Sequence, residues 1–115
     1  MKVKLLSEKA LMPQRGESGF IIYSPKVFHI GGRRMEVVHS GIQMQIPSGY
    51  VGIIKASRQY SKIGFLLNEI IDEHYREEII LPIFNEGFSE RVIVRGDPIA
   101  TLTLVPTTVV NCESV

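Results

Sequence analysis

Apolar and polar residues alternate with a period of two along much of this chain. The clearest stretch is 40–46, where Ile42, Met44 and Ile46 fall on one face and the glutamines between them fall on the other. Successive side chains of a strand point to opposite faces of a sheet, so this alternation predicts a half-buried strand.

Short apolar runs recur and predict further strands over residues 2–6, 20–23, 27–30, 35–38, 50–54, 70–71, 79–84, 91–94 and 99–105. The segments between them are rich in residues typical of turns. Many short strands at this spacing predict an all-β domain, a sandwich, jelly roll or barrel, over residues 1–106. A flexible tail over 107–115 follows, and the only helix expected is one turn over 57–62.

Proline affects the expected strand pairing in two places. Pro47 and Gly49 supply turn chemistry between the strands at 42–46 and 50–54, so the pair is expected to form a hairpin. Pro82 lies inside the run 79–84 and has no N–H to donate. We expect this strand to be at a sheet edge or bulged, or to have its proline nitrogen facing away from the neighbouring strand.

Composition limits the classes of function. Lys and Arg number 13 and Asp and Glu number 12, so a net charge of +1 gives no case for nucleic acid as a partner. No apolar run approaches the roughly 18 residues of a membrane helix. Cys112 is the only cysteine, which excludes an intrachain disulfide and fits a reducing, cytoplasmic location. The histidines show no metal-ligand spacing, so no metal site is expected.

The candidate chemistry lies between the apolar runs at 70–71 and 79–81. Asp72 and Tyr75 stand three residues apart there, in an order that predicts a strand, a tight turn and a second strand. One interpretation gives this acid and aromatic a functional role. The other is that they are plain turn residues, because Asp forms local hydrogen bonds in turns.

Several short motifs in one order resemble the dUTPase superfamily. They are the strand pair around Pro47, Gly49 and Gly52, the acid and aromatic at Asp72 and Tyr75, Asn85 at a strand end, and residues 95–102. The resemblance implies a jelly-roll fold and a homotrimer whose active sites combine neighbouring subunits. It also implies that Asp72 is a general base and that Tyr75, Ser57 and Arg58 contact the nucleotide.

The chain departs from that family at other motifs. Ile21 stands where the family has a metal-holding Asp, Ser57–Arg58 reverses an Arg–Ser pair, and Thr101 replaces a Gln. The glycine-rich C-terminal arm is absent. Hydrocarbon cannot bind Mg²⁺, and the loss of one preorganised electrostatic contact costs about 10²–10³-fold in rate. These departures predict that Asp72 is a remnant, that the chain is not an enzyme and that it has no cofactor.

A second resemblance covers residues 16–30, 83–85 and 96–104, which are similar to the adenovirus early-region-4 first-reading-frame proteins. That family is thought to descend from dUTPase and to bind host PDZ-domain proteins through its C-terminus. Such recognition needs a free carboxylate and an apolar last side chain. The chain ends in Glu113, Ser114 and Val115, an acidic variant of the motif.

The hypothesis from sequence is therefore a catalytically degenerate, dUTPase-like viral protein. It would act as an interaction module for host signalling or PDZ-domain proteins, in the host cytoplasm or nucleus. One alternative is a divergent but active dUTP nucleotidohydrolase that uses Mg²⁺ and converts dUTP to dUMP and pyrophosphate. A further alternative is a homologue that senses the nucleotide without turnover.

Overall fold

The computed structural model describes residues 1–57, 65–66 and 69–115. Within these ranges it is built of β-strands and contains no helix. The prediction of an all-β fold is confirmed. The expected helical turn over 57–62 lies outside the described residues, except for Ser57, which is in irregular structure.

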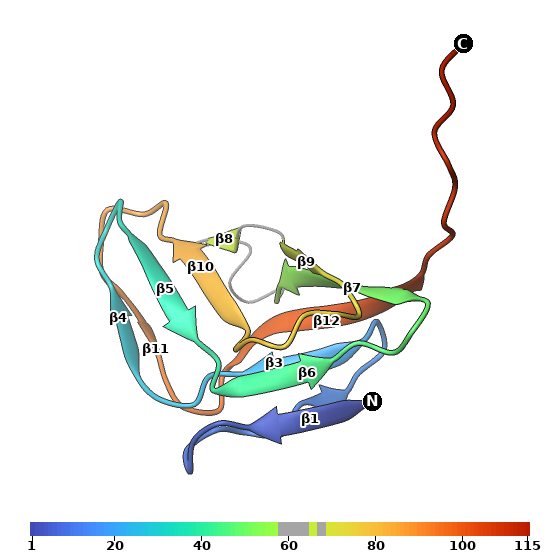
Figure 1. The fold of residues 1–115 in the computed structure, drawn as a ribbon. Coiled ribbons are helices and arrows are strands. Elements are labelled where there is room, and N and C mark those ends of the chain that lie inside the picture. The colour runs from blue at the N-terminus through green and yellow to red at the C-terminus, as the bar shows by residue number, and fades with distance from the viewer. Residues whose placement is uncertain (58–64, 67–68) are drawn as a thin grey trace.

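A five-stranded antiparallel sheet is the largest sheet formed by the described residues (Figure 1). Its strands, in spatial order, are β2 (Gln14–Arg15), β3 (Phe20–Tyr23), β12 (Pro98–Pro106), β7 (Tyr50–Ala56) and β9 (Glu69–Ile71). The longest strand, β12, lies between β3 and β7. Ile22, Ile54 and Leu102 point from this sheet into the core.

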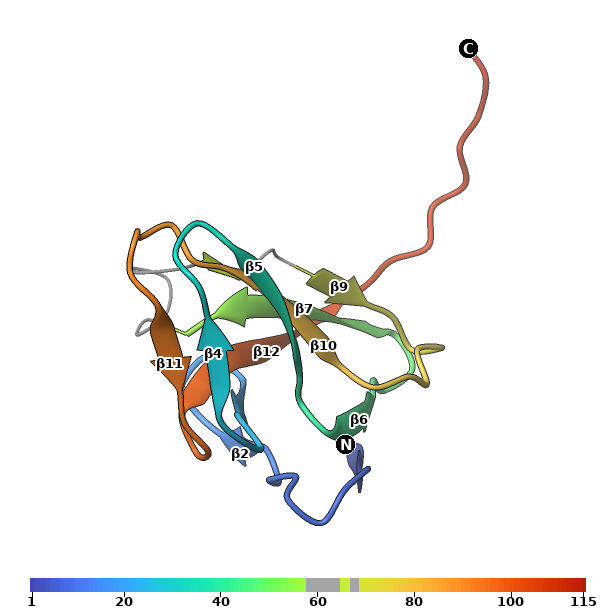
Figure 2. The same ribbon diagram turned by 90° about the vertical axis from the view of Figure 1, so that its left-hand side faces the viewer.

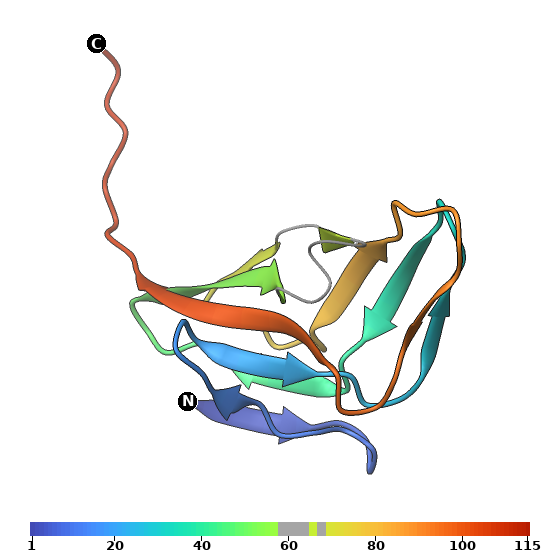
Figure 3. The same ribbon diagram turned by 180° about the vertical axis from the view of Figure 1, so that it is seen from behind.

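Three smaller antiparallel sheets make up the rest of the fold over the described ranges (Figures 2 and 3). The first has β10 (Ile80–Phe84) between β5 (Met35–His39) and β8 (Phe65–Leu66), and the second pairs β1 (Lys2–Leu5) with β6 (Ile42–Gln45). The third pairs β4 (Phe28–Ile30) with β11 (Arg91–Ile93). All the sheets contribute to one buried apolar cluster, with Val38, Leu81 and Ile93 among its fully enclosed members.

Both predicted hairpins are wrong in their pairing, although their strands and turns exist. Strand β6 pairs with β1, and β7 pairs with β12 and β9, so β6 and β7 leave the turn at 47–49 into different sheets. Likewise β9 pairs with β7, whereas β10 pairs with β5 and β8. Alternating hydrophobicity identifies which face of a strand is buried but carries no information about its partner.

Pro82 lies within a paired strand, opposite Val37 of β5. The Asn85 nitrogen donates to the Arg34 oxygen, and the Ser40 nitrogen donates to the Ile79 oxygen. The odd-numbered residues of β10 therefore form its hydrogen-bonded pairs with β5. In an antiparallel ladder hydrogen-bonded and non-hydrogen-bonded pairs alternate. The Pro82 nitrogen therefore faces away from β5, which is the last of the three arrangements expected from the sequence.

The chain leaves the body of the molecule after β12. Residues 107–115 contain no strand and are exposed, and the ribbon runs away from the sheets (Figure 1). The first of them is attached, since the Thr107 nitrogen donates to the Gly49 oxygen at 2.9 Å. The division into a domain and a flexible tail stays a prediction. No helix among the described residues has the length and apolar character to cross a membrane.

Candidate active site

Residues 72–79, called here the 72–79 loop, carry the chain from β9 in the five-stranded sheet to β10 in the three-stranded sheet. Asp72 builds its first turn. The His74 nitrogen donates to Asp72 Oδ1 at 2.9 Å, and the Tyr75 nitrogen donates to the Asp72 oxygen at 3.3 Å. Asp72 is therefore a turn-forming residue, as one interpretation of the sequence held, and its carboxylate remains exposed.

Contacts from distant segments hold the first half of the loop. Glu73 Oε2 accepts a hydrogen bond from the Gly49 nitrogen at 2.7 Å, so the loop is tied to the turn between β6 and β7. Arg76 Nη1 donates to the main-chain oxygens of Glu73 and Tyr75 at 2.8 and 2.9 Å. Gln43 of β6 donates to the Arg76 oxygen. The backbone of this segment is thus fixed by side chains rather than by a strand ladder.

Tyr75 lies across the loop and packs against the core cluster. Its hydroxyl donates to the Glu78 main-chain oxygen at 2.8 Å. Burial, and then the nearby carboxylates of Glu77, Glu69 and Glu78, raise the pKa of Tyr75 above its ordinary value. Both causes disfavour the phenolate, so Tyr75 keeps its proton at neutral pH and acts as a neutral donor.

The loop therefore presents an exposed carboxylate beside a held aromatic ring. The turn uses Asp72 Oδ1, whereas Oδ2 has no hydrogen-bond partner within the described part of the chain. A carboxylate with one oxygen free can accept a proton from water or a hydroxyl group. The flat face of a tyrosine can pack against a ring or sugar of a ligand.

The other predicted nucleotide contacts are in a different place. Ser57 follows β7, where its nitrogen donates to the Ile99 oxygen at 3.0 Å and its buried hydroxyl has no hydrogen-bond partner among the described residues. Arg58 lies outside those residues. Because Ile71 pairs with Gly52, the same antiparallel register places Asp72 level with Val51, and Ser57 lies six residues further along the chain, just beyond the end of β7. At about 3.3 Å per strand residue, the separation of Asp72 and Ser57 along the strand direction is about 20 Å.

The register of the large sheet brings together two positions at which the chain departs from the dUTPase motifs. Ile21 of β3 lies directly opposite Thr101 of β12, and Thr101 lies opposite Lys55 of β7. Their sequence neighbours Ile22, Ala100, Leu102 and Ile54 are buried, so this row faces away from the core. The changes at Ile21 and Thr101 therefore affect the same place on the outward face of the sheet. Sequence reasoning missed the exposed Lys55 because strand register has no local signal.

The residues proposed for the C-terminal motif make no described contact. Glu113, Ser114 and Val115 are exposed at the end of the tail. Among the described residues, no group of three or more His, Cys, Asp or Glu side chains is placed to hold a metal ion.

Comparison with known proteins identifies relatives over almost the whole chain. A family model described as dUTPase matches residues 8–115. The deoxyuridine 5′-triphosphate nucleotidohydrolase of Tropheryma whipplei strain Twist is 35% identical over 114 residues, which are 92% of this chain and 78% of the relative. The protein of the same name from Eremothecium gossypii is 30% identical over 109 residues, covering 90% of this chain and 71% of the relative.

Solved structures agree on the fold. A mutant dUTPase from phage phi11 of S. aureus has a TM-score of 0.92 and 23% identity, covering 99% of this chain and 95% of that chain. The dUTPase of Staphylococcus bacteriophage 80alpha gives the same TM-score and identity, with coverage of 99% and 94%. At this identity the likeness concerns the fold alone.

These matches overturn the main functional hypothesis from sequence. The interpretation as a catalytically degenerate interaction module for host signalling or PDZ-domain proteins is wrong, because relatives along nearly the full chain are nucleotidohydrolases. They also give no support to the resemblance with the adenovirus proteins. The sequence argument counted Ile21 and Thr101 as separate departures, whereas they face each other across one strand pair.

Proposed function

Because this chain belongs to the dUTPase family, we propose that it is an active dUTP nucleotidohydrolase that converts dUTP and water to dUMP and pyrophosphate. The observation that carries the proposal is the 72–79 loop. It holds Asp72 with one carboxylate oxygen that has no partner among the described residues, and Tyr75 as a neutral hydrogen-bond donor, within a chain that matches nucleotidohydrolases along its length.

Each loop residue has a chemical role in this proposal. The reaction breaks the phosphoanhydride bond between the α and β phosphorus atoms, and the oxygen of water becomes part of a product phosphate. Asp72 Oδ2 accepts the proton that water gives up, as a general base. Tyr75 packs its ring against the deoxyuridine, where a neutral aromatic excludes water. Positioning of this kind supplies much of the acceleration in phosphoryl transfer.

Magnesium enters as part of the substrate, Mg·dUTP. The described side chains offer no cluster for an all-protein site, but Mg²⁺ typically uses one or two carboxylates together with substrate phosphates. The phage phi11 dUTPase is described as coordinating a structural Mg(II) ion. This proposal follows the alternative of an active enzyme that uses Mg²⁺, and a metal delivered with the triphosphate replaces the expectation of no cofactor. Lys55, on the outer row beside Thr101, supplies a cation for phosphate oxygens.

Two observations support a homotrimer with shared sites. First, Asp72 and Ser57 lie at opposite ends of the β7–β9 pair, about 20 Å apart along the strand direction, so one chain does not bring both to the same phosphate group. Second, the outer face of the three-stranded sheet is apolar, with Met35, Val37 and Ile80 exposed by 55, 39 and 41%. Apolar patches on a soluble protein commonly mark interfaces, and a second copy of the chain is the occupant proposed here.

The activity is tested with purified protein, Mg²⁺ and dUTP, with pyrophosphate release as the readout and dTTP and dCTP as competing substrates. We expect turnover of dUTP, and a loss of about 10²–10⁴-fold in kcat for Asp72→Asn, which removes the base but keeps the shape. Glu86→Gln is the matched control, since Glu86 is an exposed acid on another loop. Binding of a nonhydrolysable dUTP analogue without turnover would instead establish the sensing alternative.

The oligomer is tested by analytical ultracentrifugation of the parent and of Val37→Lys. We expect a trimer for the parent and a shift toward monomer for the variant, because a buried unpaired charge is costly in an interface. Val109→Lys is the control, since Val109 lies in the exposed tail. A monomeric parent with full dUTP turnover would contradict the shared site.

A further inference from the structure

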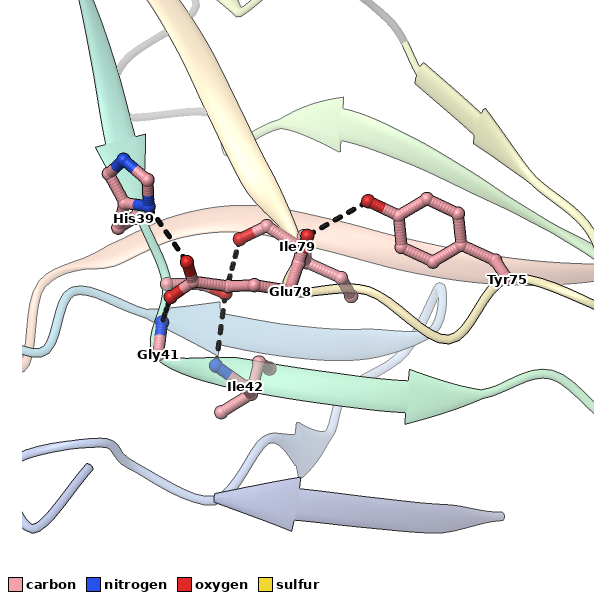
Figure 4. Close-up of polar contacts among 7 residues, drawn as sticks. His39, Gly41, Ile42, Tyr75, Glu78 and Ile79 are labelled. Carbon is pink, nitrogen blue, oxygen red and sulfur yellow. Dashed lines mark hydrogen bonds and ion pairs between the residues drawn. The ribbon is translucent and has the colours of Figure 1, made fainter. Parts of the chain in front are cut away.

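Glu78, at the far end of the 72–79 loop, makes contacts in two directions (Figure 4). Its main-chain oxygen accepts the hydrogen bond from the Tyr75 hydroxyl at 2.8 Å. Its carboxylate binds a different part of the molecule, where Oε1 lies 2.7 Å from His39 Nδ1 and Oε2 accepts from the Gly41 nitrogen at 2.9 Å. One residue therefore joins the tyrosine to the turn between β5 and β6.

The neighbouring residue is held just as firmly. The Ser40 hydroxyl donates to the Ile79 oxygen at 2.6 Å, and the Ile79 nitrogen donates to the Ile42 oxygen at 2.9 Å. The bond from the Ile79 nitrogen fixes the peptide that follows Glu78, the bond to the Ile79 oxygen fixes the next peptide, and the carboxylate bonds fix the side chain of Glu78. The Glu78 carbonyl, which accepts the hydrogen bond from Tyr75, is thus fixed both by the Glu78 side chain and by the Ile79 backbone. This restricts the position of the Tyr75 hydroxyl.

The surroundings of Glu78 allow these bonds to persist in water. Its side chain is 29% exposed, so solvent screens them less than at an open surface. Lys9 and Lys26 line the same cavity as His39 and Glu78, a space of about 320 Å³. By contrast, the adjacent Glu77 is exposed and has no hydrogen bond within the described part of the chain.

We propose that Glu78 is a positioning residue for the nucleotide. Its carboxylate, bound to Gly41 and His39, holds its own main-chain carbonyl where Tyr75 donates to it, and this sets the tyrosine ring against the deoxyuridine. The inference rests on the proposed dUTP hydrolysis. Glu78 contacts no reacting atom, so its effect appears in substrate binding and leaves the chemical step intact.

The test measures kcat and KM for dUTP separately. Glu78→Ala is expected to raise KM about five- to tenfold with kcat within about twofold, which is the scale of one or two net hydrogen bonds. Glu78→Gln is expected to restore a KM near that of the parent, because its amide oxygen can still accept from the Gly41 nitrogen and its amide nitrogen can meet His39. Glu77→Ala, which removes the same charge one residue away, should leave KM within about twofold.

A double-mutant cycle with Tyr75→Phe shows whether the effect passes through the tyrosine. If it does, Glu78→Ala adds no further rise in KM to that of Tyr75→Phe. If Glu78→Ala does not fold, Glu78→Asp replaces it, since a side chain shorter by one methylene cannot reach both partners, and a raised KM is again expected.

Two outcomes would overturn the inference, namely a parental KM in the alanine or aspartate variant, or an equal rise for Glu77→Ala. Failure of the proposed function has a different signature, because the parent itself would then release no pyrophosphate. In that case calorimetric titration with the nonhydrolysable dUTP analogue still decides the role of Glu78. A weaker Kd for the alanine variant supports it, and an unchanged Kd refutes it.

Discussion

Asn85, which ends β10, is the polar residue whose replacement we expect to cost most in stability. It is 1% exposed. Its side-chain nitrogen donates to the oxygens of Ser89, Ile30 and Gly31 at 2.9, 3.0 and 3.3 Å, and its side-chain oxygen accepts from the Gly87 nitrogen at 3.0 Å. This one amide therefore connects the β4–β5 turn to the β10–β11 loop.

Asn85→Asp keeps the shape of the side chain and replaces its donor group with an acceptor. Two to three hydrogen bonds at about 1 kcal/mol each are lost, and the carboxylate then faces carbonyl oxygens, so we expect a loss of at least about 3 kcal/mol at neutral pH. The free energy of unfolding expected for a chain of 115 residues is about 6–17 kcal/mol, so a loss of this size would be a large fraction of it.

The loss of stability caused by Asn85→Asp should increase as pH rises. Protonation gives the new aspartic acid one donor, so its folded pKa lies above the unfolded value of about 3.9. A raised folded pKa means that the folded state binds more protons, and stability falls as pH rises through that pKa. The destabilisation is thus smallest below about pH 4 and larger at pH 7.

Urea unfolding followed by circular dichroism, at one fixed protein concentration, measures this effect. Asn111→Asp makes the same chemical change in the exposed tail and should leave the free energy of unfolding within about 0.5 kcal/mol of the parent. If Asn85→Asp matches that control in both stability and pH dependence, the argument from its hydrogen bonds is refuted.

Two further predictions concern backbone conformation and titration. A Cβ at Gly19 would lie 2.2 Å from the Leu102 oxygen, whereas one at Gly49 meets nothing within 4 Å although φ is +84°. Thermal unfolding should therefore show Gly19→Ala to be severely destabilised and Gly49→Ala to lose only about 1 kcal/mol, and equal losses would contradict the contact argument. Because the pKa of Tyr75 is raised, its neutral form stabilises the fold below pH about 10, and this contribution is lost as pH rises through the folded pKa. Absorbance titration near 295 nm should show a late-ionising tyrosine that Tyr75→Phe removes, and an unchanged titration curve would refute it.

Part of the candidate site was predictable from short-range sequence. The position of Asp72 and Tyr75 between apolar runs predicted a turn, and the structure places them in one, because the bonds that form it join residues two and three apart. Their roles were implied by the family resemblance and stay a prediction. The strands were predictable too, since alternation reports directly which side chains are buried. The sequence showed that Ile21 and Thr101 depart from the dUTPase motifs, but it did not show that they are neighbours.

The contacts that hold the site were not predictable in this way. Glu73 accepts a hydrogen bond from the Gly49 nitrogen, 24 residues earlier in the chain, and Glu78 contacts His39, 39 residues earlier. Nothing in the local pattern distinguishes these two acids from Glu77, which is exposed. Their different roles follow from the crossing of the 72–79 loop between two sheets, where the sequence had indicated a hairpin.

The sequence by itself determined the all-β class, the buried faces of the strands and the turn that carries an acid and an aromatic. Each of these depends on side-chain alternation or on bonds between near neighbours, so a single segment contains the information. The tertiary structure decided which strands pair, that Ile21, Thr101 and Lys55 share one outward row, and that Tyr75 is held through Glu78. These depend on contacts between distant segments, which exist only once the sheets have closed around their common core.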